Sequence, residues 1–300
     1  MKAKVVGSTK PGYLIPLDDI LNFSGTAAGI CYMPNNWQAL QGEAVDVKMK
    51  RIKACIKYGH HSVMDHVFFN FVFEDIPKFL AMILNNEKVY TTSEKSARYT
   101  IMKTSNKEGE LYHKWIKIFK SRILEVYPNL KETMATKLAQ ENARYLISVF
   151  TPATTMMHTV SLRQLNLIIH WMKKYRVEAG SDDFSLKVKS VITDFLNTRI
   201  DDSEMTINDL TIEHLNDGCK NRHLSIFAPN YKRCDQYGEC YCTNYTASLA
   251  YFAQAQRHRT IHYEMSVPSD DSYFYIPPII QGTPLVEKWL EDIKSLKYIS

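Results

Sequence analysis

Residues 59–100 read GHHSVMDHVFFNFVFEDIPKFLAMILNNEKVYTTSEKSARYT, and this stretch decides the fold. Residues 67–73 are mostly aromatic or β-branched and are bounded by polar residues, which predicts a strand. Pro77 suits the first turn of a helix, and the apolar run at 78–84 predicts that the helix follows at once. The stretch therefore indicates an α/β (α+β) fold.

Polar side chains stand on either side of this strand and helix. Those before the strand are His60, Ser62 and Asp65, and those after the helix are Glu94, Ser96, Arg98 and Tyr99. A helix end followed by a hydroxyl-rich loop offers backbone donors, hydroxyls and a guanidinium, which are the groups that bind a phosphate monoester. The stretch predicts an anionic ligand site. The alternative is that Ser96 and Arg98 only cap and solvate a surface turn.

The order of these segments resembles the flavin-dependent thymidylate synthase family, in which GHxSxxEH leads to an RHR triplet and then to SxxxSxRY. Asp65 stands in place of the family glutamate, the four loop residues match, and residues 86–88 (NEK) stand where the triplet is expected. Further resembling segments are residues 26–32 (TAAGICY), 141–144 (ENAR), 151–154 (TPAT) and 161–165 (SLRQL). The resemblance covers roughly residues 4–200.

Several positions depart from the family pattern within these segments. Arg144 and Arg163 match family arginines, whereas Gly29 replaces an arginine and Ser161 replaces an asparagine. A later family arginine, which orients the pyrimidine, falls near Met172. The sequence thus keeps part of the family's ligand positions and has lost others.

An RHR triplet occurs far downstream, at residues 257–259. Residues 247–256 are good helix formers with apolar residues at helical spacing, and this predicted helix runs into the triplet as the family helix does. We interpret this as an internal duplication, with a first unit at 1–200, a connection at 201–216 and a partial second copy at 217–300. The alternative is a basic helix end that stabilises a helix dipole. The second copy looks truncated, and the sequence leaves open whether the natural protein ends at residue 300.

The resemblance implies a twisted, mostly antiparallel sheet with flanking helices. It also implies FAD-dependent methylation of dUMP to dTMP, with methylenetetrahydrofolate and reduced nicotinamide (NADPH) as co-substrates, in a homo-oligomer. The residues implied to bind or activate the substrate are Ser96 and Arg98 at the phosphate, Arg144 at the pyrimidine carbonyl, and Glu94 and Tyr99 beside them. The residues implied to bind the cofactor are His60, Ser62, Asp65, Arg163, Arg257, His258 and Arg259.

Two other functions stay open at this point. The losses at residues 86–88, Gly29, Ser161 and Met172 favour a non-catalytic homologue that binds a nucleotide or acts in assembly. A flavin-dependent hydroxymethylase of pyrimidine nucleotides is the third possibility, because altered folate-side residues would admit water.

Composition agrees with a cytoplasmic enzyme of 300 residues without selecting one. The net charge of +5 suits phosphorylated ligands, while the absence of long Lys/Arg runs argues against nucleic acid as a partner. We expect no membrane span and no signal peptide.

The six cysteines divide into two groups. Cys31 and Cys55 stand in apolar surroundings and are expected in the core. The other four are Cys219, Cys234, Cys240 and Cys242. Zinc is the alternative for these four, but none forms a CxxC pair, so we expect reduced thiols and no metal.

Overall fold

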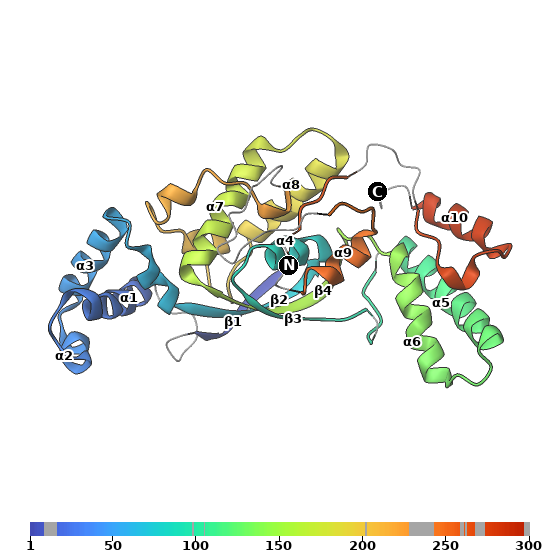
Figure 1. The fold of residues 1–300 in the computed structure, drawn as a ribbon, viewed down its shortest axis with the longest axis horizontal. Helices are drawn as coiled ribbons and strands as arrows, with labels where there is room; N and C mark the ends of the chain where they lie inside the picture. The colour runs from blue at the N-terminus through green and yellow to red at the C-terminus, as the bar shows by residue number, and fades with distance from the viewer. Residues whose placement is uncertain are drawn as a thin grey trace. The chain divides into compact units, whose positions relative to one another are not determined.

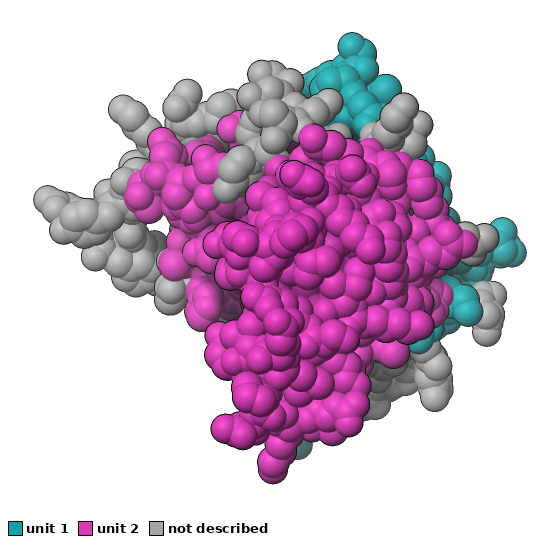
Figure 2. Space-filling model, turned by 90° about the vertical axis from the view of Figure 1, so that its right-hand side faces the viewer, with its two compact units in different colours: residues 1–74, 83–93, 155–228 teal, residues 75–82, 94–154, 229–300 magenta. Residues whose placement is uncertain are grey.

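The computed structural model describes residues 1–8, 17–97, 99–104, 106–201, 203–227, 243–258, 261, 263–267 and 274–296. These residues form two compact units (Figure 2). Unit 1 comprises residues 1–74, 83–93 and 155–228, and unit 2 comprises residues 75–82, 94–154 and 229–300. No helix in the described part of the chain is long and apolar enough to cross a membrane.

A four-stranded sheet carries the fold, with strand order β1-β2-β4-β3. The strands are β1 (Lys2–Ser8), β2 (Phe68–Pro77), β3 (Thr91–Glu94) and β4 (Pro152–Ser161). β1 pairs antiparallel with β2, with Ala3 opposite Phe73. The mixed helix-and-sheet class and the strand expected at residues 67–73 are therefore confirmed.

The alternating side chains of β2 build the core of unit 1. Phe69, Phe71 and Phe73 are buried, and the rings of Phe71 and Phe73 stack with centroids 5.2 Å apart. α7 (Leu162–Glu178) and α8 (Asp183–Leu196) follow β4 in sequence (Figure 1). Phe195 of α8 meets Phe73 edge-on at 5.5 Å, so an aromatic layer joins helix and sheet.

After β1, unit 1 continues with three helices: α1 (Leu17–Tyr32), α2 (Trp37–Gly42) and α3 (Val45–Lys57) (Figure 1). Short connections join α1 to α2 and α2 to α3. A Cβ added to Gly25 would lie 2.5 Å from the carbonyl oxygen of Lys48 on α3. A Cβ added to Gly29 would lie 2.6 Å from Leu40 and 2.9 Å from Arg51. Close packing against the α3 backbone therefore requires glycine at Gly25, whereas at Gly29 a larger residue would displace the ends of the Leu40 and Arg51 side chains. The 3-10 helix η1 (His61–His66) then leads into β2.

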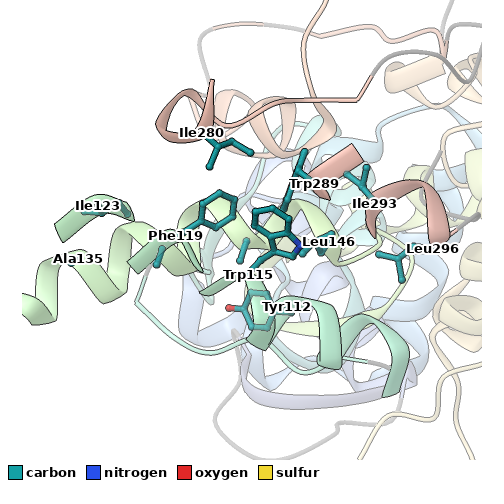
Figure 3. Close-up of a cluster of buried hydrophobic side chains, with 12 residues drawn as sticks. Tyr112, Trp115, Phe119, Ile123, Ala135, Leu146, Ile280, Trp289, Ile293 and Leu296 are labelled. Atoms are coloured by element: carbon teal, nitrogen blue, oxygen red, sulfur yellow. The ribbon is translucent and has the colours of Figure 1, made fainter. Parts of the chain in front are cut away.

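Unit 2 is built around three helices that lie together in Figure 1: α5 (Asn106–Val126), α6 (Glu132–Ala143) and α10 (Leu285–Ser295). Figure 3 shows their shared core, where Trp115 of α5 meets Trp289 of α10 edge-on with centroids 4.9 Å apart. The indole N–H of Trp115 donates to Asp292 at 2.7 Å. Residues 285–296 have an amphipathic pattern that includes Trp289 and predicts a helix, and α10 confirms it.

The remaining elements connect these parts. They are α4 (Lys78–Asn86), α9 (Leu249–Ala255) and the 3-10 helices η2 (Arg144–Leu146), η3 (Ile207–Leu210), η4 (Asp217–Cys219), η5 (Ser225–Phe227) and η6 (Pro278–Ile280). The helix expected at 78–84 is confirmed as α4, and the helix expected before the triplet as α9. The partial second copy stays a prediction, since every strand in the described ranges lies before residue 162.

Candidate functional site

A cavity of about 560 Å³ lies within unit 2. Its volume falls in the range of small-molecule sites, about 300–1,000 Å³. Four stretches of chain line it: Lys78 at the start of α4, the loop at 95–102, the segment 144–154, and the C-terminal part from Thr246 to Ile293. The cavity therefore joins the loop after β3 with the helix that precedes the downstream triplet.

The lining of this cavity is cationic. Lys78, Lys95, Arg144 and Arg257 all line it, together with His258. None of the described lining residues is an aspartate or a glutamate. Hydroxyl donors accompany the cations: Ser96, Ser148, Thr154, Thr246 and Ser248. Concentrated positive charge and hydroxyls in one cavity favour an anionic ligand such as a phosphate ester.

Lys78 is held in the cavity wall by a buried carboxylate behind it. Its ammonium group pairs with Glu94, whose side chain is only 1% exposed, and Thr154 also donates to Glu94 at 3.4 Å. Glu94 Oε2 is buried and has no hydrogen-bond partner in the described structure. Glu94 itself does not line the cavity, so direct contact between Glu94 and a substrate stays a prediction.

The Arg144 side chain has donor capacity to spare. It begins η2, directly after α6, and its Nε is buried without a hydrogen-bond partner among the described residues. Its nearest carboxylate, Glu141, is 3.8 Å from Nη1, beyond a good hydrogen bond. Its guanidinium carbon lies 5.4 Å from the ring centroid of Tyr145. A guanidinium that lines a cavity and has no carboxylate at hydrogen-bond distance among the described residues is suited to an incoming oxygen atom.

α9 brings the downstream triplet to the same cavity. The helix begins at Ser248, whose hydroxyl accepts the Tyr251 N–H at 3.1 Å, and its end is anchored by buried Gln256, which donates to the Met82 carbonyl at 3.0 Å. Arg257 and His258 follow immediately and line the cavity. The third residue, Arg259, lies outside the described residues.

The loop after β3 contributes Ser96 to the cavity. The Ser96 carbonyl accepts the N–H groups of Tyr99 and Thr100 at 3.1 and 3.2 Å, so the loop closes in a tight turn as the surface-turn alternative requires. Tyr99 is 65% exposed and does not line the cavity. Arg98 lies outside the described residues, and its expected role at a phosphate stays a prediction.

A second group of predicted site residues meets within unit 1. Arg163 pairs with Asp65 at 2.9 Å, and the Ser161 hydroxyl donates to the other oxygen of Asp65 at 2.8 Å. Ser161 also caps α7 by accepting the Gln164 N–H at 3.1 Å. The Asp65–Arg163 pair is partly exposed, at 44% and 34%, and keeps one face open to solvent.

Two further predicted residues lie near the start of η1. His60 Nδ1 hydrogen-bonds the exposed Tyr32 hydroxyl, and the two rings meet edge-on at 5.3 Å. Ser62 is exposed on η1. Contact of His60, Ser62, Asp65 and Arg163 with a cofactor stays a prediction.

The segment at residues 86–88, where the triplet was expected, is part of the interior of unit 1. The carboxylate of Glu87, 1% exposed, pairs with Arg222, and the Arg222 guanidinium stacks on Trp171 at 3.6 Å from the ring centroid. The Asn86 amide donates to the Ser225 hydroxyl at 2.8 Å. These contacts hold the loop at 222–225 against α4, so the substituted residues have a structural use.

Comparison with known proteins assigns the chain to a protein family. The model of the family described as thymidylate synthase complementing protein matches residues 19–180. The chain belongs to this family. The family match includes Ser96, Arg144 and Arg163, whereas α9, Arg257 and His258 lie beyond it.

Individual relatives of the family are distant. The flavin-dependent thymidylate synthase of Pyrococcus furiosus is 27% identical over 128 residues, which cover 39% of this chain and 50% of the relative. That of Thermococcus onnurineus is 25% identical over 180 residues, covering 55% of this chain and 67% of the relative. The chain thus spans about half to two thirds of the length of these curated relatives.

Two solved structures show low similarity. One is the flavin-dependent thymidylate synthase of Helicobacter pylori complexed with FAD and dUMP, with 15% identity, a TM-score of 0.37, and coverage of 71% of this chain and 100% of that one. The other is a UMP/dUMP methylase of Streptomyces cacaoi bound to 5-Br dUMP, also with 15% identity and a TM-score of 0.37, covering 57% and 76%.

Sequence reasoning missed Lys78 and Tyr275 in the cavity and misplaced Cys31. Lys78 was read only as the first residue of a helix, although a lysine directly after the helix-starting proline was the available signal. Cys31 is exposed rather than in the core, because it lies in the last turn of α1; Cys55 is buried as expected. No metal-binding cluster occurs among the described residues, while Cys234, Cys240 and Cys242 lie outside them.

Proposed function

We propose that this chain binds FAD and dUMP and methylates dUMP to dTMP, with methylenetetrahydrofolate as carbon donor and reduced nicotinamide as reductant. One observation carries the proposal: Ser96 and Arg144 from the family-matched region and Arg257, which follows α9, line one cationic cavity. The relatives are flavin-dependent thymidylate synthases, and this supplies the reaction class.

The cavity residues fit phosphorylated ligands. Ser96, Lys95 and Lys78 supply a hydroxyl and two ammonium groups for phosphate oxygens. Arg257 and His258 would hold the cofactor, which supplies hydride transfer when bound. Arg144 fits the same requirement, since it lines the cavity and has no carboxylate at hydrogen-bond distance among the described residues.

In the reaction itself, the chain's role is binding and electrostatic stabilisation. Arg144 would donate to the pyrimidine carbonyl and stabilise negative charge that develops there. Because the Arg144 side chain already lines the cavity, this stabilisation needs little rearrangement. We also propose that His60, Ser62, Asp65 and Arg163 contribute to cofactor binding and that the protein is a cytoplasmic homo-oligomer.

The second candidate is a non-catalytic nucleotide-binding homologue. The buried Glu87–Arg222 pair favours it, because this pair occupies the segment where the resemblance places a cofactor-binding triplet. The two candidates share the cavity as a ligand site and differ in turnover.

The test uses the purified full chain with FAD, dUMP, methylenetetrahydrofolate and NADPH. Formation of dTMP, identified by product mass, is the expected result, and Arg144→Ala should lower it at least tenfold while the control Arg199→Ala does not. A product that is heavier by one oxygen would show hydroxymethylation. Tight dUMP binding without any product would support the non-catalytic homologue instead, and absence of both FAD and dUMP binding would refute both candidates.

A further inference from the structure

Two tyrosines form an aromatic wall of the unit 2 cavity. Tyr145 in η2 and Tyr275 in the segment before η6 both line the cavity. Their ring centroids are 4.3 Å apart with an interplanar angle of 32°. Neither residue was singled out by sequence reasoning, and Tyr275 lies outside the family-matched region. We call this pair the tyrosine wall.

The tyrosine wall is held by the core of unit 2. The indole N–H of fully buried Trp289 donates to the backbone carbonyl of Tyr275 at 2.9 Å. Trp289 is itself fixed against Trp115 and Phe119, at 4.9 and 5.4 Å between centroids (Figure 3). Because its backbone is held by Trp289 and its ring packs on Tyr145, Tyr275 loses little conformational entropy when a ligand stacks on it.

The electrostatic surroundings of the wall suit a flat, neutral or electron-poor ring system. Burial is the main cause that raises the pKa of Tyr275, with its hydrogen bond to Tyr145 in support, so its hydroxyl stays protonated at neutral pH. The Arg144 guanidinium lies over the Tyr145 ring and also lines the cavity, so Tyr145 supports both Arg144 and Tyr275. An aromatic plane beside a guanidinium donor matches a heteroaromatic ring that carries a carbonyl.

We propose that Tyr275 and Tyr145 stack against the carbonyl-bearing ring of the bound ligand, with Arg144 meeting the carbonyl and the cations of the cavity meeting the phosphate. This inference rests on the proposed function and adds the residue that recognises the ring. The ring belongs either to the pyrimidine of dUMP or to the isoalloxazine of the flavin, which share this chemistry. Stacking on an aromatic side chain contributes about 1–3 kcal/mol per base, which corresponds to roughly 5- to 150-fold in affinity.

The experiment compares ligands with and without the ring. Calorimetry with the full chain would measure the affinities of dUMP, FMN and deoxyribose 5-phosphate for the wild type, Tyr275→Ala, Tyr275→Leu and Tyr275→Phe. Tyr127→Ala, at an exposed tyrosine of the same unit, is the matched control. We expect Tyr275→Ala and Tyr275→Leu to weaken dUMP or FMN binding at least fivefold, Tyr275→Phe to stay within twofold, and deoxyribose 5-phosphate binding to change in none of them.

The ligand that weakens identifies which ring stacks on the wall. If both alanine and leucine variants bind dUMP and FMN within twofold of the wild type, or weaken the ring-free phosphate equally, the inference is wrong. A folded wild type that binds neither dUMP nor FMN overturns the inference together with the proposed function. Ring-selective weakening in a protein that forms no dTMP supports the inference and refutes only the catalytic function. Near-ultraviolet circular dichroism confirms that each variant is folded, and the leucine variant keeps apolar bulk should alanine unfold the segment.

Discussion

Arginine is used in opposite ways by the interior of unit 1 and by the cavity of unit 2. In unit 1, Arg222 pairs with buried Glu87 and stacks on Trp171, and Arg51 binds both carboxylate oxygens of Glu43. In unit 2, Arg144 keeps a buried Nε without a partner among the described residues and lines a cavity that has no described acidic lining residue. Paired cations stabilise the fold, whereas a cation with unused donors provides a binding group for an anion.

Among the effects that compare the interior of unit 1 with the cavity of unit 2, we expect the largest in the interior. It is a loss of stability in acid, caused by His158. His158 is buried beside Tyr90 and Phe73, neither nitrogen has a described hydrogen-bond partner, and burial lowers the pKa of His158 to about 4. The unfolded chain, with a histidine pKa near 6.5, binds the proton first. The stability that neutral His158 contributes is therefore fully present above about pH 6.5. The free energy of unfolding falls by about 3 kcal/mol as the pH falls to about 4.

Urea unfolding between pH 4 and pH 7.5 measures this effect. His158→Phe should flatten the profile, while His113→Phe, at an exposed histidine, should leave it unchanged. An equally steep profile in His158→Phe would show that other groups cause the acid loss.

The next effect is that of Glu87→Gln on stability. The substitution removes the negative charge that faces Arg222, and because Arg222 is 28% exposed we expect the free energy of unfolding to fall by about 2–3 kcal/mol rather than by the full buried-pair cost. Chemical unfolding measures it, with Asp46→Asn of the exposed Asp46–Lys50 pair as control. The affinity for dUMP should stay the same, and a large loss of affinity with unchanged stability would contradict the structural role of this pair.

The sequence predicts the local elements of the fold and several cavity residues, but not the contacts between distant segments. The strand at 68–77 and the helices α4, α9 and α10 followed from apolar periodicity and from Pro77, which are local signals. Ser96, Arg144, Arg257 and His258 were predicted as site residues and do line the cavity. The partnership of Glu87 with Arg222, across 135 positions, depends on tertiary packing and leaves no local pattern.

The same limit applies to the cavity. Lys78 is recognised as a site residue only when its ion pair with Glu94 is known. Tyr275 is recognised only when the hydrogen bond from Trp289 to its backbone is known. Sequence also suggested an internal duplication from the displaced triplet. The structure shows that α9 and Ser96 line one cavity, and the internal duplication stays a prediction.

A smaller effect is expected for Arg144→Ala on ligand binding. Loss of a charge-assisted donor should weaken dUMP binding by about 2 kcal/mol, roughly 30-fold, with the free energy of unfolding nearly unchanged. Calorimetry and unfolding on the same preparation measure both quantities, with Arg199→Ala, an exposed arginine, as control. Loss of stability comparable to that of Glu87→Gln would remove the distinction between the two arginine environments.

The smallest effect is expected for Lys95→Met. Lys95 lines the cavity but is exposed, so its contribution to phosphate binding is about 1 kcal/mol, roughly fivefold in affinity, and is screened by salt. Titration of dUMP at 20 mM and 500 mM salt should show the difference from wild type shrinking at high salt, with exposed Lys50→Met unaffected at both. A difference that does not depend on salt would indicate a role other than charge.

The most direct test of the shared cavity is a pair of dissociation constants, one for dUMP and one for FAD, measured by calorimetry for the wild type, Arg144→Ala, Arg257→Ala and Arg199→Ala. If segments from both parts of the sequence build one ligand site, Arg144→Ala weakens dUMP binding and Arg257→Ala weakens FAD binding, each at least fivefold, and Arg199→Ala stays within twofold for both ligands. If Arg257→Ala behaves like Arg199→Ala while Arg144→Ala weakens binding, α9 does not contribute to the site, and the account is wrong.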